Sequence, residues 1–284
     1  MKIALCTISF RHQLVSLAEL AIWAQANQFQ GIELWGAHAR NLAGQPHYDG
    51  DWLAGFGLEV PMLSDYLPTE GPHEEIRQQT LSLCALARHW GAKRIRTFAG
   101  RCGSHDTTPE QRAAIAACLR EQSMMAADHG LELLVETHPG TLADCGASTL
   151  RLLDEVNHSA FKLNFDTLHV WEGGDEPLAL LRQLRPHVGY FHLKNVYCRD
   201  QLSVFNPANV YAAAGDREGM VPLFEGELDY RTFLAALLDE NEPNISASLE
   251  WFGNNAYEVL GRDRRIIAGL VREACAHPQL LAVG

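Results

Sequence analysis

The chain lacks any apolar run close to the roughly 20 residues that a membrane-spanning helix needs. Its first residues, Met-Lys-Ile-Ala-Leu-Cys-Thr, lead directly into a strand-like segment and lack the longer apolar core and cleavage site of a signal peptide. It also lacks any Cys-x-x-Cys pair, because its 7 cysteines are scattered. An odd number of isolated cysteines is typical of reduced thiols, so we expect a cytoplasmic protein without a membrane partner.

Positive charge is also scarce. The chain has 23 Lys and Arg residues against 35 Asp and Glu residues, which gives a formal net charge of -12 at pH 7. Such a surface repels phosphate backbones, so a nucleic-acid partner is disfavoured. The composition is otherwise that of an ordinary globular protein, 47% hydrophobic and 20% charged. A chain of 284 residues fits one large α/β barrel or two smaller domains.

Eight short apolar segments with the character of buried strands alternate with helical stretches. These segments are residues 3–7, 32–35, 58–63, 92–98, 131–136, 161–166, 188–192 and 246–250. Strands that alternate with helices predict a parallel sheet. Eight such units in a chain of this length predict a (β/α)8 TIM barrel that forms one domain, residues 1–284.

The alternative architecture is a doubly wound open sheet. That fold normally carries a Gly-rich phosphate-binding turn after its first strand, whereas residues 6–10 read Cys-Thr-Ile-Ser-Phe. The barrel is therefore favoured.

Two segments interrupt the alternation. Residues 36–50 are polar and Gly-rich and predict a loop. Residues 196–226 are long for a loop and rich in Asn, Gly and Pro, yet they contain Tyr197, Phe205 and Tyr211. Long loops in compact domains are usually functional or disordered. The aromatic residues favour the first reading, and we expect an ordered, lid-like insertion over a site.

Four of the predicted strands end in a residue that can bind a metal: Glu136, Asp166, His192 and Glu250. The C-terminal ends of barrel strands meet at one mouth, so these side chains are expected to converge there. Three carboxylates at one mouth repel one another unless a cation lies between them. Mixed oxygen and nitrogen ligation suits Mn²⁺ or Mg²⁺. The alternative is four unrelated strand-end residues that are solvated or paired in salt bridges.

Three further residues, His138, His169 and Lys194, each follow a predicted ligand by two or three positions. We expect them beside the metal as catalytic groups. An imidazole there can exchange protons near neutral pH, and an ammonium can stabilise developing negative charge. The alternative for each is structural: a packing or supporting histidine, or a lysine that reaches solvent.

Arg96 lies within an apolar strand, where an unpaired guanidinium would be costly. It therefore needs a partner, either an internal acid or an anionic substrate, and an arginine can clamp a carboxylate with two hydrogen bonds. Tyr66 and Arg11 are further candidates for substrate binding. Tyr66 is equally compatible with packing, and Arg11 lies in a loop where surface arginines are common.

The Glu136, Asp166, His192 and Glu250 set resembles the ligand set of the xylose-isomerase-like barrel superfamily of sugar isomerases, epimerases and endonuclease IV. That set is common to the superfamily and does not choose a reaction. Longer phrases along nearly the whole chain are similar to 3-dehydroshikimate dehydratases of petrobactin-type siderophore synthesis. These phrases are residues 5–13, 31–38, 93–100, 136–139, 209–215 and 248–253.

This resemblance implies a hydro-lyase that converts 3-dehydroshikimate, a small anionic substrate, to 3,4-dihydroxybenzoate (protocatechuate) with one Mn²⁺ or Mg²⁺. His138 is favoured as the base and His169 as the acid, although the sequence leaves their order open. The sequence also does not determine the number of subunits, and a homo-oligomer is possible. It does not show whether the product is used in siderophore synthesis or in quinate and shikimate metabolism.

Three other functions compete with the dehydratase. A sugar or cyclitol isomerase or epimerase on the same barrel would use Glu136 and Glu250 as proton carriers, but a neutral sugar needs no arginine clamp. A nuclease of the endonuclease IV type would need more ligands and a basic face, against which the net charge of -12 argues. A binding barrel without catalysis is disfavoured because all four predicted ligands are present.

Overall fold

The computed structural model describes residues 1–239 and 245–276. Within them, eight parallel strands close into a barrel in the spatial order β1-β10-β7-β6-β5-β4-β3-β2. The strands are β1 (Lys2–Cys6), β2 (Gly31–Trp35), β3 (Leu63–Ser64), β4 (Arg94–Thr97), β5 (Glu132–Glu136), β6 (Phe161–Asp166), β7 (Val188–Leu193) and β10 (Ser246–Leu249). The predicted (β/α)8 fold is confirmed. The predicted single domain, 1–284, includes residues 240–244 and 277–284, which lie outside the described part.

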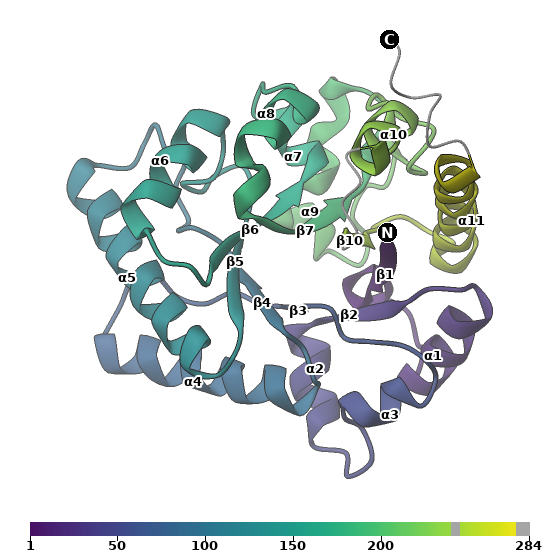
Figure 1. The fold of residues 1–284 in the computed structure, drawn as a ribbon, viewed down its shortest axis with the longest axis horizontal. Coiled ribbons are helices and arrows are strands. Elements are labelled where there is room, and N and C mark those ends of the chain that lie inside the picture. The colour runs from purple at the N-terminus through teal and green to yellow at the C-terminus, as the bar shows by residue number, and fades with distance from the viewer. Residues whose placement is uncertain (240–244, 277–284) are drawn as a thin grey trace.

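The helices surround the strands, and the last helix lies beside the first strand (Figure 1). The barrel closes where β1 pairs with β10. The helices around it are α1 (Leu17–Ala26), α2 (Gly36–Ala43), α3 (Gly50–Ala54), α4 (His73–His89), α5 (Pro109–Asp128), α6 (Gly146–Val156), α7 (Thr167–Glu172), α8 (Pro177–Leu184), α10 (Tyr230–Asp239) and α11 (Ala256–Ala276). Among the described residues, none of these helices has the length and apolar character to cross a bilayer.

Local sequence signals explain where several helices begin. Before α1, the Ser16 hydroxyl accepts from the backbone N–H of Glu19, and the Glu19 carboxylate accepts from the backbone N–H of Ser16. Thr108 and Gln111 form the same capping box before α5, with Pro109 in the first helical turn. Such reciprocal caps satisfy backbone donors that a helix start leaves unpaired.

Two predictions about individual segments were wrong. Residues 36–43 of the predicted loop form α2, because Ala39 is buried and its carbonyl accepts a hydrogen bond from the indole of Trp90 at 3.2 Å. The segment is short and polar, so its sequence does not show the apolar periodicity by which a helix is recognised. The predicted strand at 58–63 shrinks to Leu63–Ser64, preceded by an isolated bridge at Glu59. Pro61 between them has no N–H to donate to a ladder.

The predicted insertion at 196–226 contains short ordered elements. β8 (Asn195–Val196) pairs antiparallel with β9 (Met220–Val221), and η3 (Arg199–Phe205) and α9 (Pro207–Val210) lie between them. Phe205, Pro207, Val210 and Tyr211 line a pocket at the C-terminal mouth of the barrel. The segment is therefore positioned to cover that mouth, and its action as a lid stays a prediction.

We expect Gly173→Ala to lower the free energy of unfolding by about 1–3 kcal/mol, because a Cβ at Gly173 would overlap the backbone oxygen of Asp144. Gly173 ends α7, so the substitution pushes this helix away from its neighbour. Gly269→Ala in α11 is the matched control, since a Cβ there has nothing within 4 Å. It should stabilise the protein by about 0.5–1 kcal/mol. Urea unfolding measures the free energy of unfolding of both variants. If Gly173→Ala were as stable as Gly269→Ala, the close packing at Gly173 would be contradicted.

Candidate metal centre

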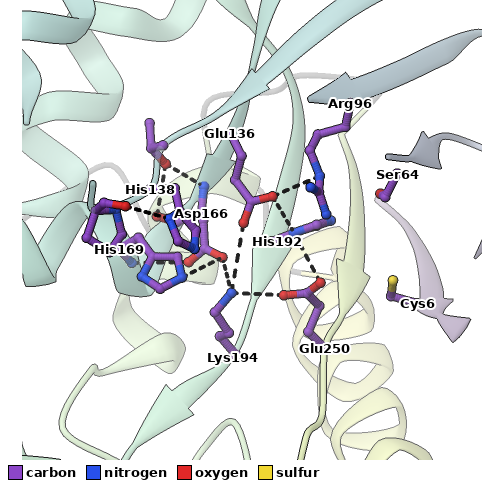
Figure 2. A network of polar contacts seen from close by, with 12 residues as sticks. Cys6, Ser64, Arg96, Glu136, His138, Asp166, His169, His192, Lys194 and Glu250 are labelled. Carbon is purple, nitrogen blue, oxygen red and sulfur yellow. Dashed lines mark hydrogen bonds and ion pairs between the residues drawn. The ribbon is translucent and has the colours of Figure 1, made fainter. Parts of the chain in front are cut away.

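The four predicted ligands converge at the C-terminal mouth of the barrel. Glu136 and Asp166 end β5 and β6, His192 lies in β7, and Glu250 directly follows β10. One ligand atom from each residue lies within 4.8 Å of the others. All four side chains are buried, and Figure 2 shows them around a common centre. The described part of the chain therefore contains a group that can hold a metal ion.

The formal charges around this centre balance with a divalent cation. Four carboxylates are buried there, the three of the ligand set and Glu33 on β2, whose carboxylate contacts His192. Two buried cations, Arg96 and Lys194, offset half of this negative charge. Burial lowers the pKa of His192, but the nearby carboxylates raise it well above its ordinary value, so His192 holds a proton until a metal displaces it. Once His192 is a neutral ligand, two negative charges remain. Because uncompensated buried charge is costly, an ion of charge +2 fits the centre.

The hydrogen bonding of His192 supports the same conclusion. Its Nε2 lies 3.0 Å from each carboxylate oxygen of Glu33. Its buried Nδ1 has no hydrogen-bond partner and lies 3.6 Å from Glu136 Oε2 and 3.5 Å from Glu250 Oε1. A nitrogen between two carboxylate oxygens can bind either a proton or a metal. Three carboxylates and one imidazole form a donor set for a hard or borderline divalent ion.

Neighbouring cations keep the carboxylates of the centre ionised. Burial raises the pKa of Glu136, but Arg96, together with the protonated His192 of the metal-free centre, outweighs it and holds this pKa well below its ordinary value. For Glu250, burial again acts upward, and His192 and Lys194 lower the pKa overall. Both side chains are therefore available as anionic ligands at neutral pH.

The predicted catalytic Lys194 lies among the ligands (Figure 2). Its ammonium is 2.5 Å from Asp166 Oδ2, 2.9 Å from Glu250 Oε2 and 4.0 Å from Glu136 Oε1. The side chain is buried, so the solvent-reaching alternative for this lysine is wrong. It can share negative charge that develops at the centre.

His138 has one ring nitrogen held and one free. Its Nδ1–H donates to the backbone carbonyl of Pro139 at 2.8 Å, so Nε2 carries the lone pair. Burial, followed by the neighbouring His169, lowers the pKa of His138 to about 3. The ring is therefore neutral near pH 7 and can accept a proton at Nε2.

His169 lies beside His138, with the ring centroids 4.4 Å apart. Its Nδ1–H donates to the Glu172 carboxylate at 2.7 Å, and its Nε2 lies 4.0 Å from Asp166 Oδ2. The Asp166 carboxylate also caps α7 by accepting from the backbone N–H of His169 at 3.1 Å. A carboxylate behind an imidazole orients the ring and stabilises it when it carries a proton.

Arg96 has the internal acid that its burial requires. Its Nε lies 2.9 Å from Glu136 Oε2, and its guanidinium stacks over the rings of Tyr66 and Phe98, at 5.3 and 4.9 Å from their centroids. The buried Nη1 of Arg96 has no hydrogen-bond partner. Arg96 is thus part of an ion pair and still has a donor for a ligand in the pocket that it lines with Tyr66.

Arg11, unlike the other predicted site residues, directs its guanidinium at backbone carbonyls. Its guanidinium donates to the backbone carbonyls of Val210, Ile8 and Phe252, at 2.7, 3.2 and 3.5 Å. These contacts tie the 196–226 segment to the loops after β1 and β10. Substrate binding by Arg11 stays a prediction without a contact that favours it.

The structure adds two residues that the sequence did not single out, Glu33 and Glu172, and it gives Tyr211 of the predicted insertion a partner. Glu33 and Glu172 support His192 and His169, and the Tyr211 hydroxyl hydrogen-bonds to that of Tyr66. The cavity in front of the proposed catalytic groups has a volume of about 50 Å³. A neighbouring chamber of about 410 Å³ shares Tyr66 and Tyr211 as lining residues. Of the two supporting carboxylates, only that of Glu172 could be inferred from the local sequence, because Glu172 follows His169 by three residues and lies one helical turn away.

Comparisons with known proteins agree with this geometry. The family model of the xylose isomerase-like TIM barrel matches residues 22–271. A 3-dehydroshikimate dehydratase of Bacillus anthracis is 43% identical over 273 residues, which cover 94% of this chain and 96% of that protein. The crystal structure of the probable 3-DHS dehydratase AsbF, described as involved in petrobactin synthesis in Bacillus anthracis, has a TM-score of 0.90 and 43% identity, and the match covers 94% of this chain and 99% of that one.

A more distant structure, the IOLI protein with a zinc atom, matches with a TM-score of 0.73 and 16% identity over 96% of this chain and 99% of that one. This similarity shows a common fold. The match of the family model and the similarity along nearly the whole length lead to one conclusion: the chain belongs to the xylose isomerase-like TIM barrel family.

Proposed function

We propose that this protein is a 3-dehydroshikimate dehydratase, a hydro-lyase that depends on one Mn²⁺ or Mg²⁺ ion. The observation that carries the proposal is the 43% identity over 94% of the chain to a 3-dehydroshikimate dehydratase. The buried ligand set supports the metal dependence. We propose siderophore assembly as the use of the product, since the AsbF relative is described as involved in petrobactin synthesis. The 7 free thiols fit the predicted cytoplasmic location.

The reaction removes the hydrogen at C4 and the hydroxyl at C5 of the substrate. Loss of a C6 hydrogen and protonation of the C3 oxygen then give the aromatic product, 3,4-dihydroxybenzoate, and one water. The difficult step is the first, because a hydrogen next to a ketone is only weakly acidic. Glu136, Asp166, His192 and Glu250 would hold the metal ion, which supplies a Lewis acid next to that ketone.

The two histidines are suited to the two proton transfers. His138 is neutral, and its free Nε2 accepts the C4 proton. His169, supported by Glu172 at 2.7 Å, delivers a proton from Nε2 to the departing C5 hydroxyl. Their rings lie 4.4 Å apart, so both reach one six-membered ring.

The remaining side chains hold the substrate and exclude water. The Lys194 ammonium stabilises negative charge on the C3 oxygen. Arg96 binds the ring carboxylate through its unpaired Nη1, with Tyr66 beside it. We assign to residues 196–226 the role of a lid, because Phe205 and Tyr211 line the inner cavity. A dry cavity strengthens each of these electrostatic contacts.

Purified protein with Mn²⁺ or Mg²⁺ should convert 3-dehydroshikimate to an aromatic product that is followed by its ultraviolet absorbance. Chelation of the metal should abolish turnover, and added Mn²⁺ or Mg²⁺ should restore it. Ketohexoses and inososes are the control substrates for the isomerase or epimerase alternative and should remain unchanged. Metal-loaded protein that produces no dihydroxybenzoate, or that turns over a neutral sugar instead, would refute the dehydratase proposal.

His138→Gln should lower kcat by about 10²–10⁴-fold while the bound metal per protein stays unchanged, because it removes the proposed base and no metal ligand. His129→Gln is the matched control. His129 also donates from Nδ1 to a backbone carbonyl at 2.8 Å, but it lies at the end of α5. The activity of the His129→Gln variant should equal that of the wild type. Equal losses in both variants would remove His138 from the mechanism.

Arg96→Lys should raise KM by about tenfold, the equivalent of about 1.4 kcal/mol, because lysine keeps the charge and loses the planar fork. Arg11→Lys is the comparison, since the hydrogen bonds of Arg11 go to backbone carbonyls. It should lower thermal stability and leave KM within about twofold. Steady-state kinetics of both variants show which arginine binds the carboxylate. A raised KM in Arg11→Lys with an unchanged KM in Arg96→Lys would assign the carboxylate to Arg11 instead.

A further inference from the structure

Glu33 is a buried carboxylate that the proposed reaction does not use. It lies in β2 among apolar neighbours, and its residue is 0% exposed. Charged carboxylates are almost never fully buried without partners that compensate them. Its main partner is His192 on the far side of the barrel interior, whose Nε2 lies 3.0 Å from both Glu33 oxygens.

The carboxylate of Glu33 is itself held in place from both adjacent strands. The Ser64 hydroxyl of β3 donates to Glu33 Oε1, and the Cys6 thiol of β1 donates to the same oxygen at 3.5 Å. Cys6 is also the register partner of Glu33 between β1 and β2. Figure 2 shows Cys6 and Ser64 on the side of His192 away from Lys194. Glu33 therefore rests on rigid strands rather than on a loop.

This arrangement determines which nitrogen of His192 faces the centre. A carboxylate only accepts hydrogen bonds, so His192 carries its hydrogen on Nε2. Its Nδ1 is left without a hydrogen-bond partner, 3.6 Å from Glu136 Oε2 and 3.5 Å from Glu250 Oε1. We propose that Glu33 is a positioning residue for the metal centre, which holds His192 with Nδ1 aimed at the ion. The inference rests on the metal site proposed above and is independent of the substrate.

A purely structural Glu33–His192 pair makes a different prediction from a positioning role. A structural pair would contribute to folding and leave the affinity for metal unchanged. A positioning carboxylate orients the imidazole and increases its strength as a ligand, and loss of such partners typically weakens metal affinity about 10–100-fold. The decisive measurement is therefore metal binding by protein without substrate.

The test compares Mn²⁺ dissociation constants of metal-free wild type, Glu33→Gln and Glu33→Leu, with free Mn²⁺ measured by electron paramagnetic resonance. We expect affinity to fall about 10-fold in Glu33→Gln, which keeps an acceptor, and toward 100-fold in Glu33→Leu, which removes it. Asp263→Asn is the matched control, because Asp263 is also a buried carboxylate but accepts from the backbone N–H of Leu223. Its Mn²⁺ affinity should equal that of the wild type.

Wild-type affinity in a folded Glu33→Leu protein overturns the inference, as does an equal loss in Asp263→Asn. If Glu33→Leu does not fold, Ser64→Ala decides, since it removes one hydrogen bond to Glu33 and no charge. A measurable loss of Mn²⁺ affinity in Ser64→Ala supports the positioning role, and an unchanged affinity overturns it. Wild-type protein that binds no divalent ion would refute the metal site itself, whereas absence of dehydratase activity in protein that binds Mn²⁺ would refute only the substrate.

Discussion

Repulsion among buried carboxylates is the constraint on which the rest of the site depends. Four carboxylates lie inside one barrel mouth, and the barrel strands leave them little freedom to separate. Arg96 and Lys194 offset half of their charge, at 2.9 Å from Glu136 and 2.5 Å from Asp166 respectively. A divalent ion would offset the remainder. The same charges that favour a metal also place an ammonium and a guanidinium beside the proposed metal site, where they can act on a substrate anion.

The three imidazoles at the mouth follow one design. In each, an acceptor outside the centre binds one ring N–H, so the other nitrogen is directed by that contact. The acceptors are the Pro139 carbonyl for His138, the Glu172 carboxylate for His169 and the Glu33 carboxylate for His192. The acceptors differ in charge, and this difference suits the different tasks that we propose for the rings. Burial lowers the pKa of His138 and outweighs the carbonyl behind it, so this ring stays neutral, whereas a carboxylate such as the one behind His169 can stabilise a ring that carries a proton.

The barrel and the convergence of its four candidate ligands could be predicted because both follow from short local patterns. Four of the strands are brief apolar runs with a candidate ligand at or next to the C-terminal end, and the (β/α)8 closure brings those ends together. The supporting residues could not be predicted in this way. Glu33 stands inside an apolar strand and contacts His192, 159 positions away, and no local pattern encodes that distance. Pro61 lacks an N–H for the ladder before β3, and α2 is stabilised by a contact with the distant Trp90 that its own sequence does not show.

Two spaces at the barrel mouth, an inner cavity and an outer chamber, are relevant to how a substrate ring would reach the proposed metal site. The inner cavity, which Arg96, His138 and Lys194 line, has a volume of about 50 Å³. The outer chamber is larger, at about 410 Å³, and the hydrogen-bonded Tyr66 and Tyr211 line both spaces. Tyr211 belongs to the 196–226 segment, whereas Tyr66 follows β3. If residues 196–226 act as the proposed lid, its opening would break this contact, and reformation of the contact behind the ring would exclude water during the proton transfers.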